Sequence, residues 1–194
     1  MKLKNLIKNF FLVTLLPFYF VASLWAWDDG FTITLTPVGA RGVVVDDSGV
    51  NLNLGDIAVG GSTRTLSAIN VISTGSISNI EYNIKGSVSG AVPAALSTDL
   101  TIENAELLLQ VKFNTVDPDG TANDYVATDI VDAVAEHAGS LGGDNAFEGD
   151  EDVDNLTNEP HETRHLWCRV EIPQVANFGG EQSITVTITA EAGE

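Results

Sequence analysis

The fold class of this chain is decided by the stretch Ile184-Thr185-Val186-Thr187-Ile188-Thr189-Ala190. Apolar and threonine side chains alternate strictly in it, so an extended strand here has one apolar face and one polar face. The β-branched residues also favour a pleated, half-buried strand. The stretch therefore predicts a strand that packs one face against a hydrophobic core.

The same alternation recurs along the chain, with short Gly-, Ser-, Asn- and Pro-containing turns between the segments. Several short strands with such spacing indicate an all-β sandwich or barrel that is mainly antiparallel. Strands that alternate with helices, as a parallel sheet requires, are not indicated. The further strands that we predict are Phe31 to Thr36, Val50 to Leu54, Thr63 to Val71, Asn79 to Lys85, Leu107 to Phe113 and His165 to Ile172.

One segment departs from this pattern. Between Thr128 and Ala138 the apolar residues recur at helical spacing, which predicts one short helix inserted between strands. The stretch Gly139 to Glu162 follows, is rich in Gly and Asp, and is predicted to be a long acidic loop.

A resemblance to a known class of domain rests on the segment Leu52-Asn53-Leu54-Gly55-Asp56-Ile57-Ala58-Val59-Gly60-Gly61-Ser62-Thr63-Arg64-Thr65-Leu66. It resembles a pattern of Ig-like β-sandwiches in bacterial surface and secreted proteins and in Hydin-type scaffold proteins. There a strand ends in Leu-Gly-x-Val, a Gly-Ser turn follows, and the next strand closes with Asn-x-Gly, where this chain has Ser73. The resemblance implies an Ig-like sandwich with a role in adhesion, assembly or scaffolding, and no catalytic residues. We expect one such domain over residues 27–194.

The N-terminal segment predicts export. Three lysines precede an apolar run from Phe10 to Trp25, and the small residue Ala26 follows it, which is the layout of a secretory signal peptide over residues 1–26. An uncleaved membrane anchor is the alternative, but the run is interrupted by Pro17 and is shorter than the roughly 20 residues of a full span. We therefore predict a secreted or surface-displayed protein whose mature chain is not embedded in the membrane.

Charge and cysteine content narrow the function further. The net charge is −18, and it is −21 without the three lysines of the predicted signal, which excludes a nucleic-acid partner. A negative charge of this size either attracts divalent cations or keeps a protein soluble in salt. The single cysteine, Cys168, falls on the apolar face of its predicted strand and is expected to be a buried hydrophobe rather than a reactive thiol. His165 falls on the opposite face, which argues against a shared metal site.

The acidic loop contains the strongest candidate site. Asp150, Asp152 and Asp154 have the 1-3-5 spacing that delivers successive carboxylates to Ca²⁺, and Glu148 lies beside them. Position 12 of an EF-hand loop would be His161, so an EF-hand is excluded. A looser calcium site and a solvated acidic loop both stay open.

No motif for nucleophilic, phosphoryl-transfer or zinc-protease chemistry is present, so we predict that the chain is not an enzyme. The leading prediction is a non-catalytic structural subunit that assembles into a filament or coat by adding the strand Phe31 to Thr36 to a neighbouring sheet. Its partner would be another copy or another surface protein. The alternative is a calcium-dependent adhesion module that recognises carbohydrate or a surface ligand through residues 139–162. An exported hydrolase is a third alternative, for which no residue stands out.

Overall fold

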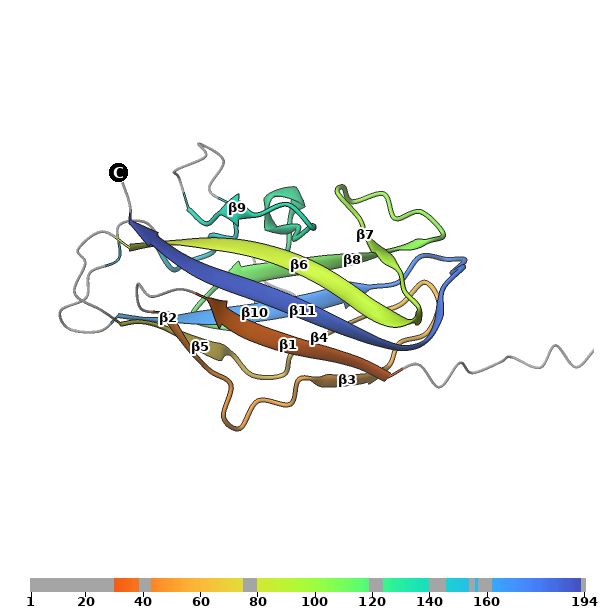
Figure 1. The fold of residues 1–194 in the computed structure, drawn as a ribbon, viewed down its shortest axis with the longest axis horizontal. Coiled ribbons are helices and arrows are strands. Elements are labelled where there is room, and N and C mark those ends of the chain that lie inside the picture. The colour runs from red at the N-terminus through yellow and green to blue at the C-terminus, as the bar shows by residue number, and fades with distance from the viewer. Residues whose placement is uncertain are drawn as a thin grey trace, which may run out of the picture.

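A computed structural model describes residues 30–38, 43–74, 80–118, 124–139, 146–153, 156 and 162–192, with only the backbone at 30, 36–38 and 192. Two β-sheets are stacked in an elongated molecule, which confirms the predicted all-β sandwich (Figure 1). Among these residues no helix has the length and apolar character to cross a membrane. The predicted signal peptide, residues 1–26, lies outside the described residues.

The sheet in front in Figure 1, called sheet A here, has the strand order β3-β1-β11-β6-β9, and the other, sheet B, has the order β2-β5-β10-β8-β7 with β4 also on β10. The described strands pair antiparallel except for β1 with β11 and β7 with β8, which are parallel. The bounds in sheet A are β1 Gly30–Val38, β3 Asn53–Asp56, β6 Ile80–Val92, β9 Glu136–His137 and β11 Gly179–Ala192. Those in sheet B are β2 Val43–Asp46, β4 Ser62–Arg64, β5 Ile69–Ser73, β7 Ala95–Leu96, β8 Glu106–Phe113 and β10 Thr163–Glu171.

The core lies between the two sheets, and the alternation of the sequence predicts which side chains enter it. On β11 every second residue from Ile184 to Ala190 is buried, whereas the intervening threonines are half-buried on the outer face. The rings of Tyr82 on β6 and Phe113 on β8 stack with centroids 5.8 Å apart and so join the two layers. Cys168 is fully buried on the core face of β10, as predicted.

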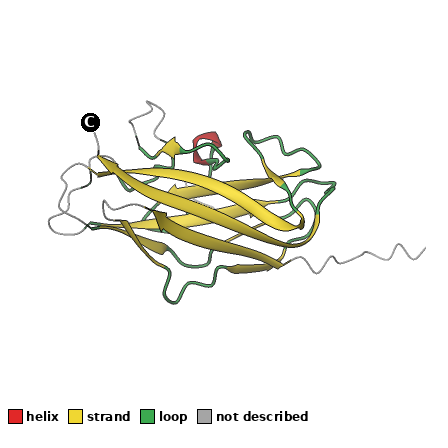
Figure 2. Ribbon diagram, viewed as in Figure 1, coloured by secondary structure: helices red, strands yellow, loops and turns green. Residues whose placement is uncertain are grey.

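The helix predicted from Thr128 to Ala138 is wrong. This segment has a single 3₁₀ turn, Ala127–Asp129, which is the red element in Figure 2. After the turn Ile130 forms a bridge with Gln110 of β8, and the Val131 N–H donates to the carbonyl of Leu109. The segment therefore satisfies its backbone by pairing with a strand, which replaces the hydrogen bonds of a helix.

The turn is anchored by a buried ion pair. Lys112 of β8 contacts the Asp129 carboxylate at 3.1 Å and donates to the carbonyl of Asp124 at 3.0 Å, and the Val126 N–H donates to Asp129 at 2.7 Å. Burial raises the pKa of Asp129, while the Val126 N–H and the Lys112 ammonium act in the opposite direction. Segment 124–131 covers the outer face of β8, which explains why this strand is buried on both faces.

The strand predicted from Thr63 to Val71 is interrupted. Arg64 pairs with Arg169 and Ile69 with Leu166, so the four residues 65–68 oppose the two residues 167–168 and the chain bulges between β4 and β5. In the segment that resembles Ig-like sandwiches, Gly55 and Gly60 have positive φ angles of 68° and 74°, which only glycine adopts at little cost. This segment supplies one short strand to each sheet, β3 and β4.

Candidate functional site

The strand predicted to mediate assembly is β1, and it lies within sheet A. It pairs with β11 in parallel over eight residue pairs, from Phe31 with Gln182 to Val38 with Thr189. Among the described residues β3 pairs with its other edge over Gly30–Thr32, and Ile33 donates from its N–H to the Leu52 carbonyl. In the part of the chain described here, β1 therefore pairs with β11 over most of its length and with β3 over only three residues.

The side chains of β1 fill one end of the core. Phe31 and Ile33 are 2% and 1% exposed, and Leu35 packs partly buried against the same cluster. Thr32 and Thr34 alternate with them and face outward. The strand therefore combines main-chain pairing on β11 with side chains that enter the core at every second position, which are the two requirements of a strand that completes a sheet.

The described part of the acidic loop, residues 146–153, is held against the end of β8. The Phe113 N–H donates to the Phe147 carbonyl at 2.8 Å, and the Gly149 N–H donates to the Phe113 carbonyl at 2.9 Å. Phe147 is fully buried at a φ of 61°, a left-handed conformation that is unusual for a large side chain. A Cβ at Gly149 would approach Asn114 Oδ1 to 2.4 Å, so this position requires glycine.

The predicted calcium ligands take separate roles where they are described. The Asp150 carboxylate accepts from the N–H and the hydroxyl of Thr115, at 2.6 and 2.5 Å, and the Asp150 N–H donates to Asn114 Oδ1. Asp152 is exposed, and its carbonyl accepts from Arg164 Nε. Glu148 bridges to the backbone of Phe113, and Asp154 lies outside the described residues.

The calcium site stays a prediction, because a full set of four ligands cannot be assembled from described positions. Within the described part of the chain, no group of three or more His, Cys, Asp and Glu side chains is arranged to hold a metal ion.

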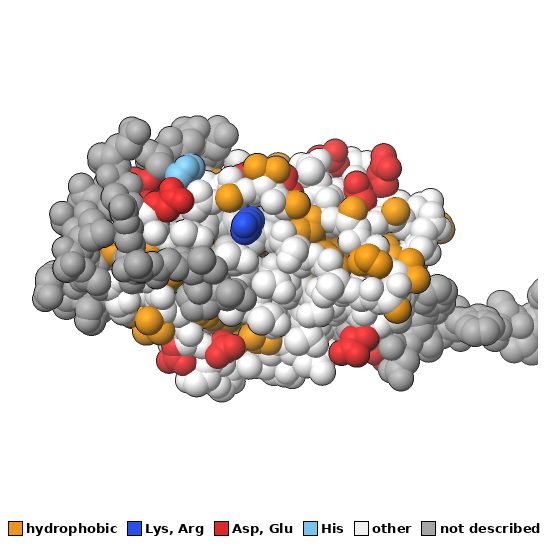
Figure 3. Space-filling view, in the orientation of Figure 1, with side chains coloured by type: hydrophobic (Ala, Val, Ile, Leu, Met, Phe, Trp, Pro, Cys, Tyr) orange, Lys and Arg blue, Asp and Glu red, His pale blue; other side chains and the backbone are white. Residues whose placement is uncertain are grey.

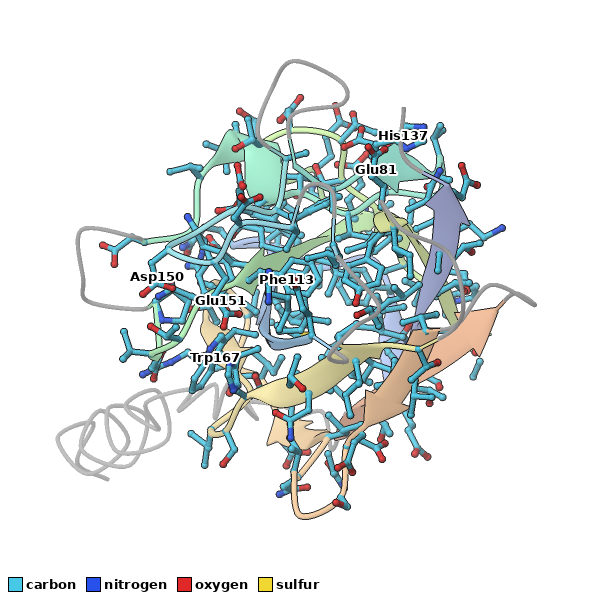
Figure 4. All side chains as sticks on the ribbon, turned by 90° about the vertical axis from the view of Figure 1, so that its left-hand side faces the viewer. Glu81, Phe113, His137, Asp150, Glu151 and Trp167 are labelled. Carbon is cyan, nitrogen blue, oxygen red and sulfur yellow. The ribbon has the colours of Figure 1, made fainter. Side chains whose placement is uncertain are left out.

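A contact that the sequence analysis missed joins the acidic segment to β10. Glu151, which is 9% exposed, accepts from the backbone N–H of His165 at 2.5 Å and contacts the His165 ring Nδ1 at 2.6 Å (Figure 4). One carboxylate thus binds both the backbone and the side chain of the same residue. The alternation in 165–172 placed His165 opposite to Cys168, which is correct, but no local pattern identified Glu151 as its partner.

Trp167 of β10 lies on the same outer face of sheet B. Its ring N–H donates to the Asn114 carbonyl at 2.8 Å, and only 7% of the residue is exposed. Its indole is therefore a packing element of this end of the sheet. Asn114 also holds Asp150, so a single residue links the tryptophan to the acidic segment.

Comparison of the sequence with protein-family models finds none that matches, and no curated protein matches it. The functional argument therefore rests on the residues of the chain itself.

Proposed function

We propose that this chain is a non-catalytic structural subunit, exported by its N-terminal signal, that assembles head to tail by exchange of β1 between copies. The parallel pairing of β1 with β11, together with the burial of Phe31 and Ile33, is the observation that carries the proposal. The partner is a second copy of the chain, and the location is the cell exterior or surface.

A β1 strand from another copy can pair with β11 in the same way as the β1 strand of the same chain. The strand is joined to β2 of the opposite sheet by residues 39–42 alone, and nothing in a parallel pair requires that the two strands be linked by a short turn. A β1 strand from another copy would make the same hydrogen bonds to β11 and place the same side chains in the core. Contacts of this head-to-tail kind generate filaments when the rotation between successive copies does not close a ring.

The distribution of charge on the outer face of sheet A, which contains β1 and β11, supports association at that face. A net charge of −18 opposes contact between copies, so association requires a surface with few acidic groups. Over its described part, the centre of the face of sheet A seen in Figure 3 is mostly uncharged, and acidic side chains lie toward its rim. The outward residues there are largely Thr and Ser, among them Thr34, Thr185, Thr187 and Ser87.

The type of sandwich is part of the proposal. We propose an Ig-like sandwich because two stacked sheets share a mainly antiparallel pairing, and because segment 52–66 crosses from one sheet to the other through the glycine positions of the pattern. Ig-like sandwiches have many different functions, so the proposed role is argued from the exchange of β1 and not from the fold.

The experiment is a measurement of size and shape by light scattering and negative-stain microscopy, first with Ca²⁺ and then with a chelator. The proposal expects filaments or large oligomers, which are lost when residues 27–38 are deleted. A wild-type chain that stays monomeric at every concentration contradicts it. Dissolution by the chelator would add the acidic segment to the interface, and filaments that resist the chelator would assign assembly to β1 alone.

A further inference from the structure

A second cluster of polar side chains lies on the outer face of sheet A, and its residues are distinct from the predicted calcium ligands. Glu81 and Asn83 are two residues apart on β6 and therefore share a face, and Asn83 is paired directly with His137 of β9. Directly opposite residues have Cβ atoms about 5 Å apart, and residues two apart on a strand are separated by about 7 Å. Figure 4 shows Glu81 and His137 close together at one end of the sheet, away from Asp150 and Glu151.

Each of the three side chains holds a buried polar atom that has no hydrogen-bond partner among the described residues. These atoms are Glu81 Oε2, Asn83 Oδ1 and His137 Nδ1, and Glu81 as a whole is only 3% exposed. Lys85, the next residue on this face of β6, is exposed and makes no ion pair with a described residue. A buried polar atom without a hydrogen bond costs roughly 1–3 kcal/mol, and more where its group is charged, so these atoms favour a bound cation or hydrogen-bond donor.

The described backbone N–H groups of Ala138, Ile80 and Leu156, which lie beside Glu81, are bonded to other carbonyls and do not supply that donor. The Ala138 N–H donates to the Tyr82 carbonyl, and Ile80 and Leu156 exchange both of their backbone hydrogen bonds. The chain thus pairs with β6 on both sides of Glu81. A buried carboxylate whose Oε2 has no partner among the described residues, and which shares its face with an imidazole and an amide oxygen, differs from a solvated acidic loop.

The chemistry of the three atoms selects the ligand. The carboxylate oxygen and the amide oxygen are lone-pair donors, and so is the imidazole Nδ1 when the ring proton is on Nε2, so together they attract a cation and repel an anion. Ca²⁺ and Mg²⁺ prefer oxygen ligands alone, whereas imidazole favours Zn²⁺ and its neighbours among the transition metals. We propose that Glu81, Asn83 and His137 form a binding site for a borderline divalent cation of the Zn²⁺ type.

Calorimetric titration of the purified protein with Zn²⁺, in an excess of Ca²⁺ that occupies carboxylate-only sites, tests this assignment. We expect one high-affinity Zn²⁺ ion per chain. Loss of a group that only orients a metal ligand costs about 10–100-fold in affinity, so Glu81→Gln and His137→Gln should each weaken binding by at least that factor. The matched control is His165→Gln, which removes the histidine already bound to Glu151 and should leave Zn²⁺ affinity unchanged.

The nitrogen resonances of the His137 ring in the wild-type protein provide a second readout that does not depend on a variant folding. Coordination should shift Nδ1 strongly on addition of one equivalent of Zn²⁺, and in the metal-free protein Glu81→Gln should be no less stable than the wild type because it removes a buried charge. Absence of high-affinity binding overturns the proposal. So does equal weakening by His165→Gln, or a His137 ring that does not respond to Zn²⁺.

Discussion

Thr34 of β1 and Thr185 of β11 are direct partners in the parallel pair that holds the N-terminal strand in sheet A. Both side chains face outward, and the neighbouring pair Ile33 and Ile184 points into the core. Cα atoms of adjacent strands lie about 5 Å apart, which is within the range that a disulfide spans. This pair therefore distinguishes a β1 strand that closes its own sheet from one that closes the sheet of another copy.

The first prediction concerns the energetic contribution of β1. Ile33→Ala removes fully buried apolar surface and leaves a cavity, so it should lower the free energy of unfolding by about 2–5 kcal/mol in urea denaturation. Thr34→Ala, on the outer face of the same strand, should change it by less than about 1 kcal/mol. Equal effects of the two substitutions would show that β1 does not enter the core.

The second prediction concerns the buried pair Lys112–Asp129. Lys112→Met leaves Asp129 buried and without its ammonium, which should cost about 3–5 kcal/mol at neutral pH. The double variant Lys112→Met/Asp129→Asn should recover part of this loss, because the amide oxygen still accepts from Val126. A double variant as unstable as the single one would contradict the assignment of the loss to an unpaired charge.

The loss of stability in the Lys112→Met variant should depend on pH, because it arises from the buried carboxylate of Asp129. Burial raises the pKa of Asp129 above that of the unfolded chain, so the folded state binds its proton more tightly. The deficit of the variant relative to the wild type should therefore shrink as the pH falls toward the ordinary carboxyl pKa of about 4. Urea denaturation at a series of pH values measures it, and a deficit that grows on acidification would contradict this cause.

The third prediction concerns Cys168. Burial raises the pKa of its thiol to about 12, so it should not react with thiol reagents near neutral pH until the protein unfolds. In the unfolded chain a thiol ionises near pH 8.5, so the free energy of unfolding should fall as the pH rises above that value. Cys168→Ala should reduce this dependence, whereas the buried tyrosines contribute equally in both proteins. Rapid labelling of the folded wild type would contradict the prediction.

The parts of the fold that the sequence predicted are those with a local pattern. β11 alternates strictly, and its buried face is the predicted one, as is the face of β10 that carries Cys168, whereas β8 is buried on both faces. The helix prediction failed because Ile130 and Val131 have helical spacing to their neighbours but satisfy their backbone on β8, a partner seventeen or more residues earlier in the chain. The pairing of β1 with β11 joins residues about 150 positions apart, and no local pattern encodes such a neighbour.

The same reason explains which site residues were missed. Asp150 and Asp152 were proposed from a local spacing, and their calcium role stays a prediction, whereas the contact of Glu151 with His165 depends on how residues 146–153 fold back on β10. Glu81 and His137 come together through the pairing of β6 with β9, and each alone resembles an ordinary surface residue in the sequence. Their proximity and the burial of Glu81 arise only in the folded chain, so no local pattern in the sequence predicts them.

The fourth prediction concerns calcium. If the acidic segment binds Ca²⁺, the ion should raise the melting temperature of the wild type, and Asp152→Ala should weaken that effect because Asp152 is an exposed carboxylate of the predicted site. Asp47→Ala is the matched control, since Asp47 is an exposed acidic residue in a distant turn. Thermal unfolding that does not respond to Ca²⁺, or that responds equally in both variants, would remove the calcium prediction.

The most direct test of the proposed assembly is disulfide formation between two single-cysteine variants. Thr34→Cys and Thr185→Cys chains are refolded together and oxidised, and a mixture of Thr34→Cys with Ser87→Cys is the control, because Ser87 lies one strand beyond Thr185. Exchange of β1 predicts a Thr34→Cys/Thr185→Cys heterodimer on a non-reducing gel and a ladder of oligomers from the double variant. A double variant that yields only internally bridged monomers, with no heterodimer from the mixture, would contradict the account.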